Sequence, residues 1–180
     1  YRLLRPVLEH QPPAHVVCRE GKPDDLLPQL AAHRLDVVLS DQMAPAGTPF
    51  QTFSHLVGSS TVSFCAAGKL ATKLAANFPA STKDAPWLLP TANTNLRRSL
   101  EKWFHKHRIR PHIVGEFEDT ALLMTFGRSG LGLFPAPALL AGEIATQYGA
   151  VPVGEMTEVR EQFYAITAER RIRHPALEAM

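Results

Sequence analysis

Three polar stretches of the sequence carry side chains that could bind a small ligand. They are Ser40-Asp41-Gln42, the loop Thr91–Asn95, and Glu116–Thr120, and each follows a short apolar run that predicts a buried strand. Ligands of open α/β sheets bind outside the carboxyl ends of the strands, so we expect the three stretches to converge on one cleft. The candidate ligand contacts are Ser40, Asp41, Gln42, Thr91, Asn93, Thr94, Asn95, Phe117, Asp119 and Phe134.

Simpler roles remain open for several of these residues. Thr94 or Asn95 could cap the helix predicted from Leu96, and Asp119 could cap the following helix. Asp41 ends a strand with no obvious helix to cap, and it could be a solvated turn residue. The loop before Leu96 also lies where a helix dipole favours an anion or a polar oxygen.

Alternating helix and strand signals would position these loops. Apolar spacing predicts helices over 1–10, 26–31, 69–76, 96–107, 120–126 and 138–146, and a last helix from His174-Pro175. It predicts strands over 15–19, 35–39, 87–89, 112–114, 131–134 and 151–153, and extended crossover segments over 52–66 and 162–167. This order predicts an α/β fold with parallel strands and right-handed crossovers. We expect one lobe from 1–60 and 161–180, and a second from 61–160.

Composition excludes several classes of protein. The net charge of the 180 residues is only +2, without the clustered basic footprint of a nucleic-acid groove. No apolar run approaches the about 20 residues of a membrane span, and no export signal is recognisable, so we expect a cytoplasmic protein that does not bind membranes. Cys18 and Cys65 are too few for a zinc site or a disulfide framework, and we expect both to be buried.

The sequence supports neither a phosphate-binding loop nor a catalytic site. Gly127–Gly132 follows a predicted helix and precedes a strand, the reverse of a phosphate-binding loop. No nucleophile, acid or base stands at a catalytic spacing, so we predict neither an enzyme nor a cofactor. We interpret the basic run as a solvated helix face or, alternatively, a subunit contact; it comprises Arg97, Arg98, Lys102, Lys106, Arg108 and Arg110.

Several motifs together carry a family resemblance. The strand Trp87-Leu88-Leu89-Pro90 before a helix, the Gly130–Pro135 strand and the return strand before the last helix resemble the effector-binding domain of LysR-type transcriptional regulators. The resemblance covers essentially the whole chain. Further motifs are similar to the branch that activates a sodium/proton antiporter gene, namely Leu88-Leu89-Pro90, Trp103-Phe104, Gly115–Asp119, Ala168-Glu169-Arg170 and His174-Pro175-Ala176.

The resemblance implies a fold and an assembly. The fold would be two Rossmann-like lobes joined by two crossover strands, as in type II periplasmic binding proteins. A strand ahead of Tyr1, a tail beyond Met180 and an N-terminal winged helix-turn-helix that binds promoter DNA would lie outside this sequence. The resemblance also implies a homo-oligomer, a dimer or a tetramer, in which this domain does not itself contact DNA.

The resemblance further implies an effector. The family uses the Thr91–Asn95 loop for effector contact, and the antiporter branch implies sodium or lithium as the signal. Hard cations prefer oxygen ligands, so Asp41, Glu116, Glu118 and Asp119 are weak candidates for direct contact, although the ion could equally act indirectly. A solute-binding protein of a transport system and an enzyme of aromatic amino acid synthesis share this architecture and are the alternatives.

Overall fold

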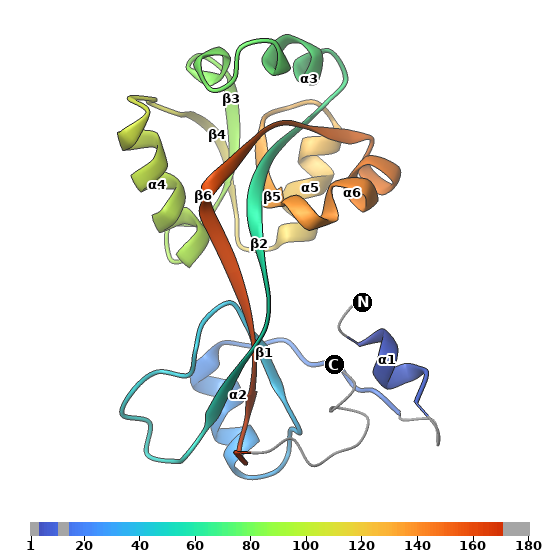
Figure 1. Cartoon of the computed structure of the whole chain (residues 1–180), viewed down its shortest axis with the longest axis vertical. Coiled ribbons are helices and arrows are strands. Elements are labelled where there is room, and N and C mark those ends of the chain that lie inside the picture. Colours follow the sequence, from blue (N-terminus) through green and yellow to red (C-terminus); the bar gives the residue numbers. More distant parts are fainter. Residues whose placement is uncertain (1–3, 11–14, 171–180) are drawn as a thin grey trace. The chain divides into compact units, whose positions relative to one another are not determined.

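The computed structural model describes residues 4–10 and 15–170, and the chain forms two compact units (Figure 1). Unit 1 comprises the described residues up to Ser59 and from Gln162 onward, and unit 2 comprises Ser60–Glu161. None of the helices in the described ranges combines the length and apolar character that a membrane span needs.

The order of helices and strands follows the prediction in unit 2, whereas in unit 1 no strand separates the first two helices among the described residues. The helices are α1 (Arg5–Leu8), α2 (Pro23–Ala31), α3 (Gly68–Ala75), α4 (Asn95–Lys106), α5 (Thr120–Arg128) and α6 (Ala141–Tyr148), with 3₁₀ turns η1 (Ala80–Thr82) and η2 (Ala138–Leu140). The strands are β1 (Val38–Ser40), β2 (Phe53–Ala67), β3 (Pro86–Pro90), β4 (His112–Phe117), β5 (Phe134–Pro137) and β6 (Ala150–Thr167). Hydrogen-bonded neighbours run β1-β6-β2-β5 in one sheet and β3-β4 in the other.

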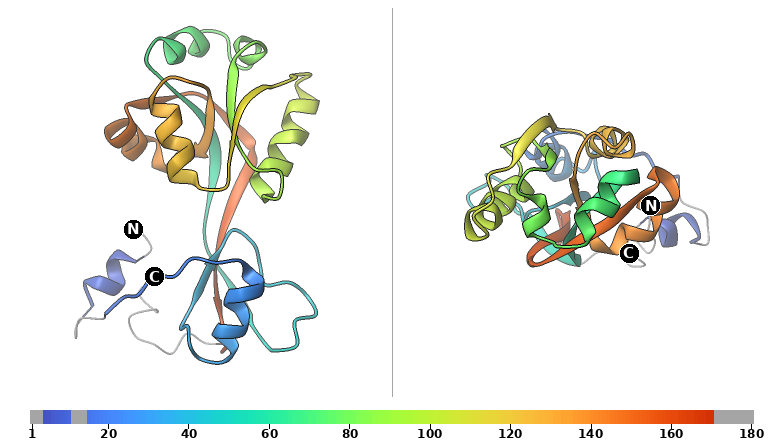
Figure 2. Two further views of the ribbon diagram at one scale, coloured as in Figure 1. Left: turned by 180° about the vertical axis from the view of Figure 1, so that it is seen from behind. Right: turned by 90° about the horizontal axis from the view of Figure 1, so that it is seen from above.

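Unit 2 is layered around the parallel pair β3 and β4. Figure 1 and the reverse view in Figure 2 show α4 on one side of this pair and α5 with α6 on the other. Successive side chains of β3 point to opposite faces of the sheet. Trp87 and Leu89 lie in one core cluster with α4, whereas Leu88 lies in a second cluster with α5. The parallel prediction is therefore confirmed for this pair, and both faces of β3 are buried.

The apolar stripe of α4 packs as its spacing predicts. Leu100, Trp103 and Phe104 are buried on the β3 side, and Leu96 is packed against the same cluster. The ring of Phe64 on β2 lies 5.2 Å from that of Trp103 and 4.7 Å from that of Trp87. These edge-to-face aromatic contacts fix α4, and with it the loop that precedes the helix.

The strand predicted over 131–134 is displaced. The strand β5 begins at Phe134 and pairs with β2, and the pairing is antiparallel. Leu133 forms only an isolated bridge to Trp87. At Gly132 a Cβ would lie 3.1 Å from the carbonyl oxygen of Pro86, so glycine permits this close approach of two backbones.

Unit 1 departs further from the predicted parallel βαβ order. Residues 15–22 form neither helix nor strand, so the strand predicted over 15–19 is wrong. A strand needs a hydrogen-bonded neighbour, and the partner of β1 is β6, with Val38 opposite Ile166 in antiparallel register. Cys18 is consequently exposed, against prediction, while Cys65 is buried as predicted.

Two further predictions concern the ends of the chain. The helix predicted over 1–10 is observed as α1 and is shorter, although 1–3 lie outside the described residues, as does the last helix from His174. The two segments predicted over 151–153 and 162–167 are one continuous strand, β6. Its buried residues recur every third position from Ala150 to Val159, a spacing that strand alternation does not reveal.

Candidate functional site

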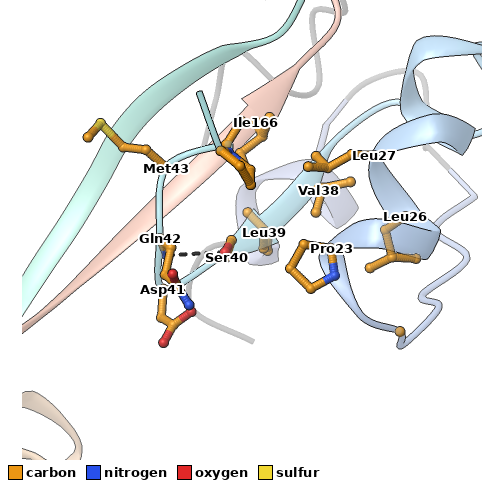
Figure 3. Close-up of a pocket in the computed structure, with 13 residues that line it drawn as sticks. Pro23, Leu26, Leu27, Val38, Leu39, Ser40, Asp41, Gln42, Met43 and Ile166 are labelled. Carbon is orange, nitrogen blue, oxygen red and sulfur yellow. Dashed lines mark hydrogen bonds between the residues drawn. The ribbon is translucent and has the colours of Figure 1, made fainter. Parts of the chain in front are cut away.

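The first candidate group lines a pocket in unit 1. Ser40, Asp41 and Gln42 border a pocket of about 210 Å³ between the start of α2, the strand β1 and the loop that follows β1 (Figure 3). The remaining lining residues are Gly21, Pro23, Leu26, Leu27, Val38, Leu39, Met43, Ala44, Pro45 and Ile166. The pocket therefore has a mainly apolar wall with polar groups along one side.

Backbone geometry orients the polar side of this pocket. The hydroxyl oxygen of Ser40 accepts a hydrogen bond from the Gln42 N–H at 3.1 Å, which bends the chain sharply after β1. Asp41 and Gln42 are exposed, whereas Ser40 is half-buried. The carboxylate and the amide are thus accessible to a ligand at the carboxyl end of the strand.

The second candidate group lies in unit 2, at the loop between β3 and α4. Thr94 is the N-cap of α4, and its hydroxyl accepts from the Arg97 N–H at 3.2 Å and donates to the Thr91 carbonyl at 3.0 Å. The Thr91 hydroxyl donates to Asn93 Oδ1 at 2.7 Å. The Thr91 N–H donates to the carbonyl of Phe117, at the end of β4, at 3.1 Å. The structure therefore brings Thr91–Asn95 together with Phe117.

The capping roles weighed from the sequence are partly realised. Thr94 caps α4, and Asp119 caps α5 by accepting from the Leu122 N–H at 2.5 Å. Asn95 is instead the first residue of α4, and its side-chain oxygen accepts from Arg98 Nη2. The ring of Phe117 folds over Gly115 and lies 4.9 Å from that of Phe126. Thr94 and Asp119 thus have structural partners that a ligand contact would have to share.

Two of the candidates, Phe134 and Glu116, already contact other side chains of unit 2. Phe134 is fully buried in the core of unit 2, where its ring offers no exposed surface. The carboxylate of Glu116 is held by Arg97 Nη1 at 2.5 Å. A metal site would need at least three acidic, histidine or cysteine side chains close together. Among the described residues there is no such group, so Glu118 does not belong to one either.

Sequence reasoning missed Arg97 as a member of this region. We expected a solvated cation, but its side chain is only 9% exposed. Arg97 precedes Leu100 by three residues and Phe104 by seven, so it lies on the buried stripe of α4. That spacing was the available signal, and the surrounding basic run obscured it.

Shifted pKa values lie outside both candidate groups. Burial raises the pKa of the Cys65 thiol to about 12. Hydrogen bonds from Lys106 and His107 lower the pKa of the Glu158 carboxyl. Lys106 Nζ and His107 Nε2 lie 2.5 Å and 2.9 Å from the two carboxylate oxygens of Glu158, so these side chains join the end of α4 to β6 within unit 2.

Comparison of the sequence with known proteins identifies related chains. The family described as LysR substrate binding domain matches residues 1–180. The transcriptional activator protein NhaR of Escherichia coli (strain K12) is 34% identical over 166 residues, which make up 92% of this chain and 54% of that protein. This chain therefore spans about half the length of that curated relative.

Solved structures share the fold. Vibrio fischeri DarR in complex with DNA has a TM-score of 0.73 at 17% identity, covering 98% of this chain and 59% of that one. The effector-binding domain of QuiR in complex with shikimate has a TM-score of 0.65 at 15% identity, covering 99% of this chain and 84% of that one. At such identities the likeness shows the fold alone, and it confirms the predicted α/β class of the type II periplasmic-binding-protein kind.

Proposed function

Because this chain belongs to the family of LysR substrate-binding domains, we propose that it senses sodium or lithium ions for a transcriptional activator. The observation that carries the proposal is the 34% identity to the NhaR activator across 92% of this chain. The name of that relative describes a transcriptional activator, which favours a regulator over the solute-binding protein of a transport system. The antiporter-branch motifs support the ionic signal, and the likeness supports a homo-oligomer that binds promoter DNA through a part outside these 180 residues.

The proposed contacts are the polar groups at the carboxyl ends of strands. In unit 1 they are Ser40, Asp41 and Gln42, whose pocket supplies an accessible carboxylate and amide. In unit 2 they are the Thr91–Asn95 loop with Asp119. Since Glu116 is paired with Arg97, a cation reaching that carboxylate would first have to compete with a guanidinium.

The proposed mechanism is a shift between conformations. A ligand changes an equilibrium only by its difference in affinity for the two states. A signal ion or small effector must therefore bind the activating arrangement more tightly than the other one. By linkage, operator DNA then raises the affinity for the effector by the same factor.

The test uses the full-length protein and its own promoter fragment. DNA affinity is measured by fluorescence anisotropy with sodium, lithium or potassium chloride as the only varied salt, at one constant ionic strength. Constant ionic strength is essential because every phosphate contact makes DNA binding weaken with salt. We expect sodium and lithium to change the DNA affinity relative to potassium, and identical affinities in all three salts would refute the proposal. Sedimentation of the same sample tests the homo-oligomer.

A further inference from the structure

Arg97 joins the ends of two neighbouring strands. Its Nη1 donates to the carbonyl oxygen of Pro90, the last residue of β3, at 2.9 Å, and to Glu116 Oε1 on β4 at 2.5 Å. Its Nε donates to Glu101 Oε1 at 3.0 Å, one turn further along α4. One side chain therefore ties β3, β4 and α4 together next to the Thr91–Asn95 loop.

The burial of this cation requires compensation. The Arg97 side chain is 9% exposed, whereas Glu116 and Glu101 are 47% and 56% exposed. A buried charge without partners is strongly unfavourable, so the guanidinium stays buried only while the two carboxylates and the carbonyl hold it. The acceptors lie in different directions from the planar fork, an arrangement that lysine cannot reproduce.

Backbone bonds continue from this junction into the loop. Arg97 binds Pro90 and Glu116, and the residue that follows each of them in the sequence is joined to the other strand. The Thr91 N–H donates to the carbonyl oxygen of Phe117. The Arg97 N–H donates to the Thr94 hydroxyl, and the Thr94 N–H donates to the Thr91 carbonyl at 3.2 Å. The side chain and backbone of Arg97 thus hold the loop at both of its ends.

We propose that Arg97 is the positioning residue of the Thr91–Asn95 loop, holding its hydroxyl and amide groups in one arrangement at the carboxyl ends of β3 and β4. Arg97 does not itself touch the ligand. The effect of Arg97 on ligand binding rests on the proposed function. The effect of Arg97 on the order of the Thr91–Asn95 loop is independent of that function. Preorganisation of this kind raises affinity because a ligand need not order the loop when it binds.

The first experiment measures hydrogen–deuterium exchange of the full-length protein by mass spectrometry, without added ligand. Peptides covering 91–96 report on the loop, and peptides covering 86–90 report on β3. We expect exchange in the loop to be about tenfold faster in Arg97→Lys, which keeps the charge but loses the fork, with β3 unchanged. Glu116→Gln keeps an acceptor on an exposed side chain, and we expect a smaller acceleration of about threefold.

The matched control is Lys102→Gln, which removes an exposed cation from the same helix and should leave exchange in the loop unchanged. Unchanged exchange of 91–96 in Arg97→Lys would overturn the proposal. Equal acceleration of 91–96 and 86–90 would also overturn it, because Arg97 would then only stabilise unit 2 as a whole.

The second experiment titrates sodium chloride against promoter binding at constant ionic strength. In Arg97→Lys we expect the sodium concentration at half-response to rise about fivefold or more, with the maximum response unchanged. If the wild type responds to sodium and Arg97→Lys has the same sodium concentration at half-response, the link between Arg97 and ligand binding is overturned. Absence of any sodium-specific response in the wild type would refute the proposed function, whereas the exchange result would still decide the role of Arg97.

Discussion

Gly127 on α5 lies directly against the ring of Phe134, so a Cβ built on this glycine would stand 2.3 Å from two ring carbons. Phe134 is fully buried, and close-packed neighbours leave its ring little room to move. We therefore expect Gly127→Ala to lower the free energy of unfolding by about 1–3 kcal/mol. Urea denaturation followed by the fluorescence of Trp87 and Trp103, both in the core of unit 2, measures the change.

Gly142 provides the matched control for this prediction. It also lies in a helix, α6, but a Cβ there would meet no atom within 4 Å. Gly142→Ala should be neutral or stabilising by up to about 1 kcal/mol, since alanine has the higher helix propensity. Equal effects of the two substitutions would contradict the steric explanation.

Asp41 and Thr91 test the candidate contacts of the two units. Asp41→Ala removes an exposed carboxylate at the pocket of unit 1, and Thr91→Val removes a hydroxyl from the loop of unit 2. Each change should raise the effector concentration at half-response about fivefold or more while basal DNA binding stays unchanged. Titrations of the full-length protein measure both quantities. Asp36→Ala, an exposed carboxylate outside the pocket, is the control, and normal responses in both test variants would place the contacts elsewhere.

The two thiols should differ sharply in reactivity. The thiolate is the nucleophile, and burial raises the pKa of Cys65 to about 12, whereas Cys18 is exposed. With iodoacetamide at about pH 8, Cys65 should react at least about a hundredfold more slowly than Cys18, as followed by peptide mass spectrometry. Both thiols should react alike in denaturant. Rapid labelling of Cys65 in the native protein would show that its core opens readily.

Glu158 should make stability depend on acid pH. Lys106 and His107 lower its pKa in the folded protein below the ordinary value of 4.5. A lowered folded pKa means that the stabilisation is present above the unfolded pKa and is lost as the pH falls through the folded value. The melting temperature of wild type should therefore fall more steeply below pH 4.5 than that of Glu158→Gln. Equal slopes for wild type and Glu158→Gln would contradict this role of the Lys106 and His107 contacts.

The elements of unit 2 were predictable because local patterns and packing agree there. The stripe Leu100, Trp103 and Phe104 predicts α4, and the apolar run Trp87–Leu89 predicts a strand buried on both faces. The antiparallel pairing of β5 was not predictable, because the direction of pairing is set by distant strands. The backbone of Gly132 lies close to the carbonyl oxygen of Pro86, and β5 begins only after this contact, at Phe134.

Unit 1 and the candidate groups were predictable only in part. Val16 and Val17 favour a strand, yet their segment has no hydrogen-bonded neighbour among the described residues. Predicted strand ends correctly located Asp41-Gln42 and Thr91–Thr94 as loop segments, whereas Ser40 is the last residue of β1 and Asn95 is the first residue of α4. The buried Arg97 was missed because its charge predicts exposure, whereas its bonds to Pro90 and Glu116 depend on how α4 packs. Thr94 and Asp119 show that capping residues can be identified from sequence while a ligand role cannot.

The pairing of β1 with β6 has a consequence for synthesis of the chain on the ribosome. Val38 emerges long before its partner Ile166, whereas unit 2 is one uninterrupted stretch from Ser60 to Glu161. At translation rates of about 5–20 residues per second, β1 waits on the order of ten seconds for its neighbour. Unit 2 can therefore fold first, and the returning end of β6 then completes unit 1.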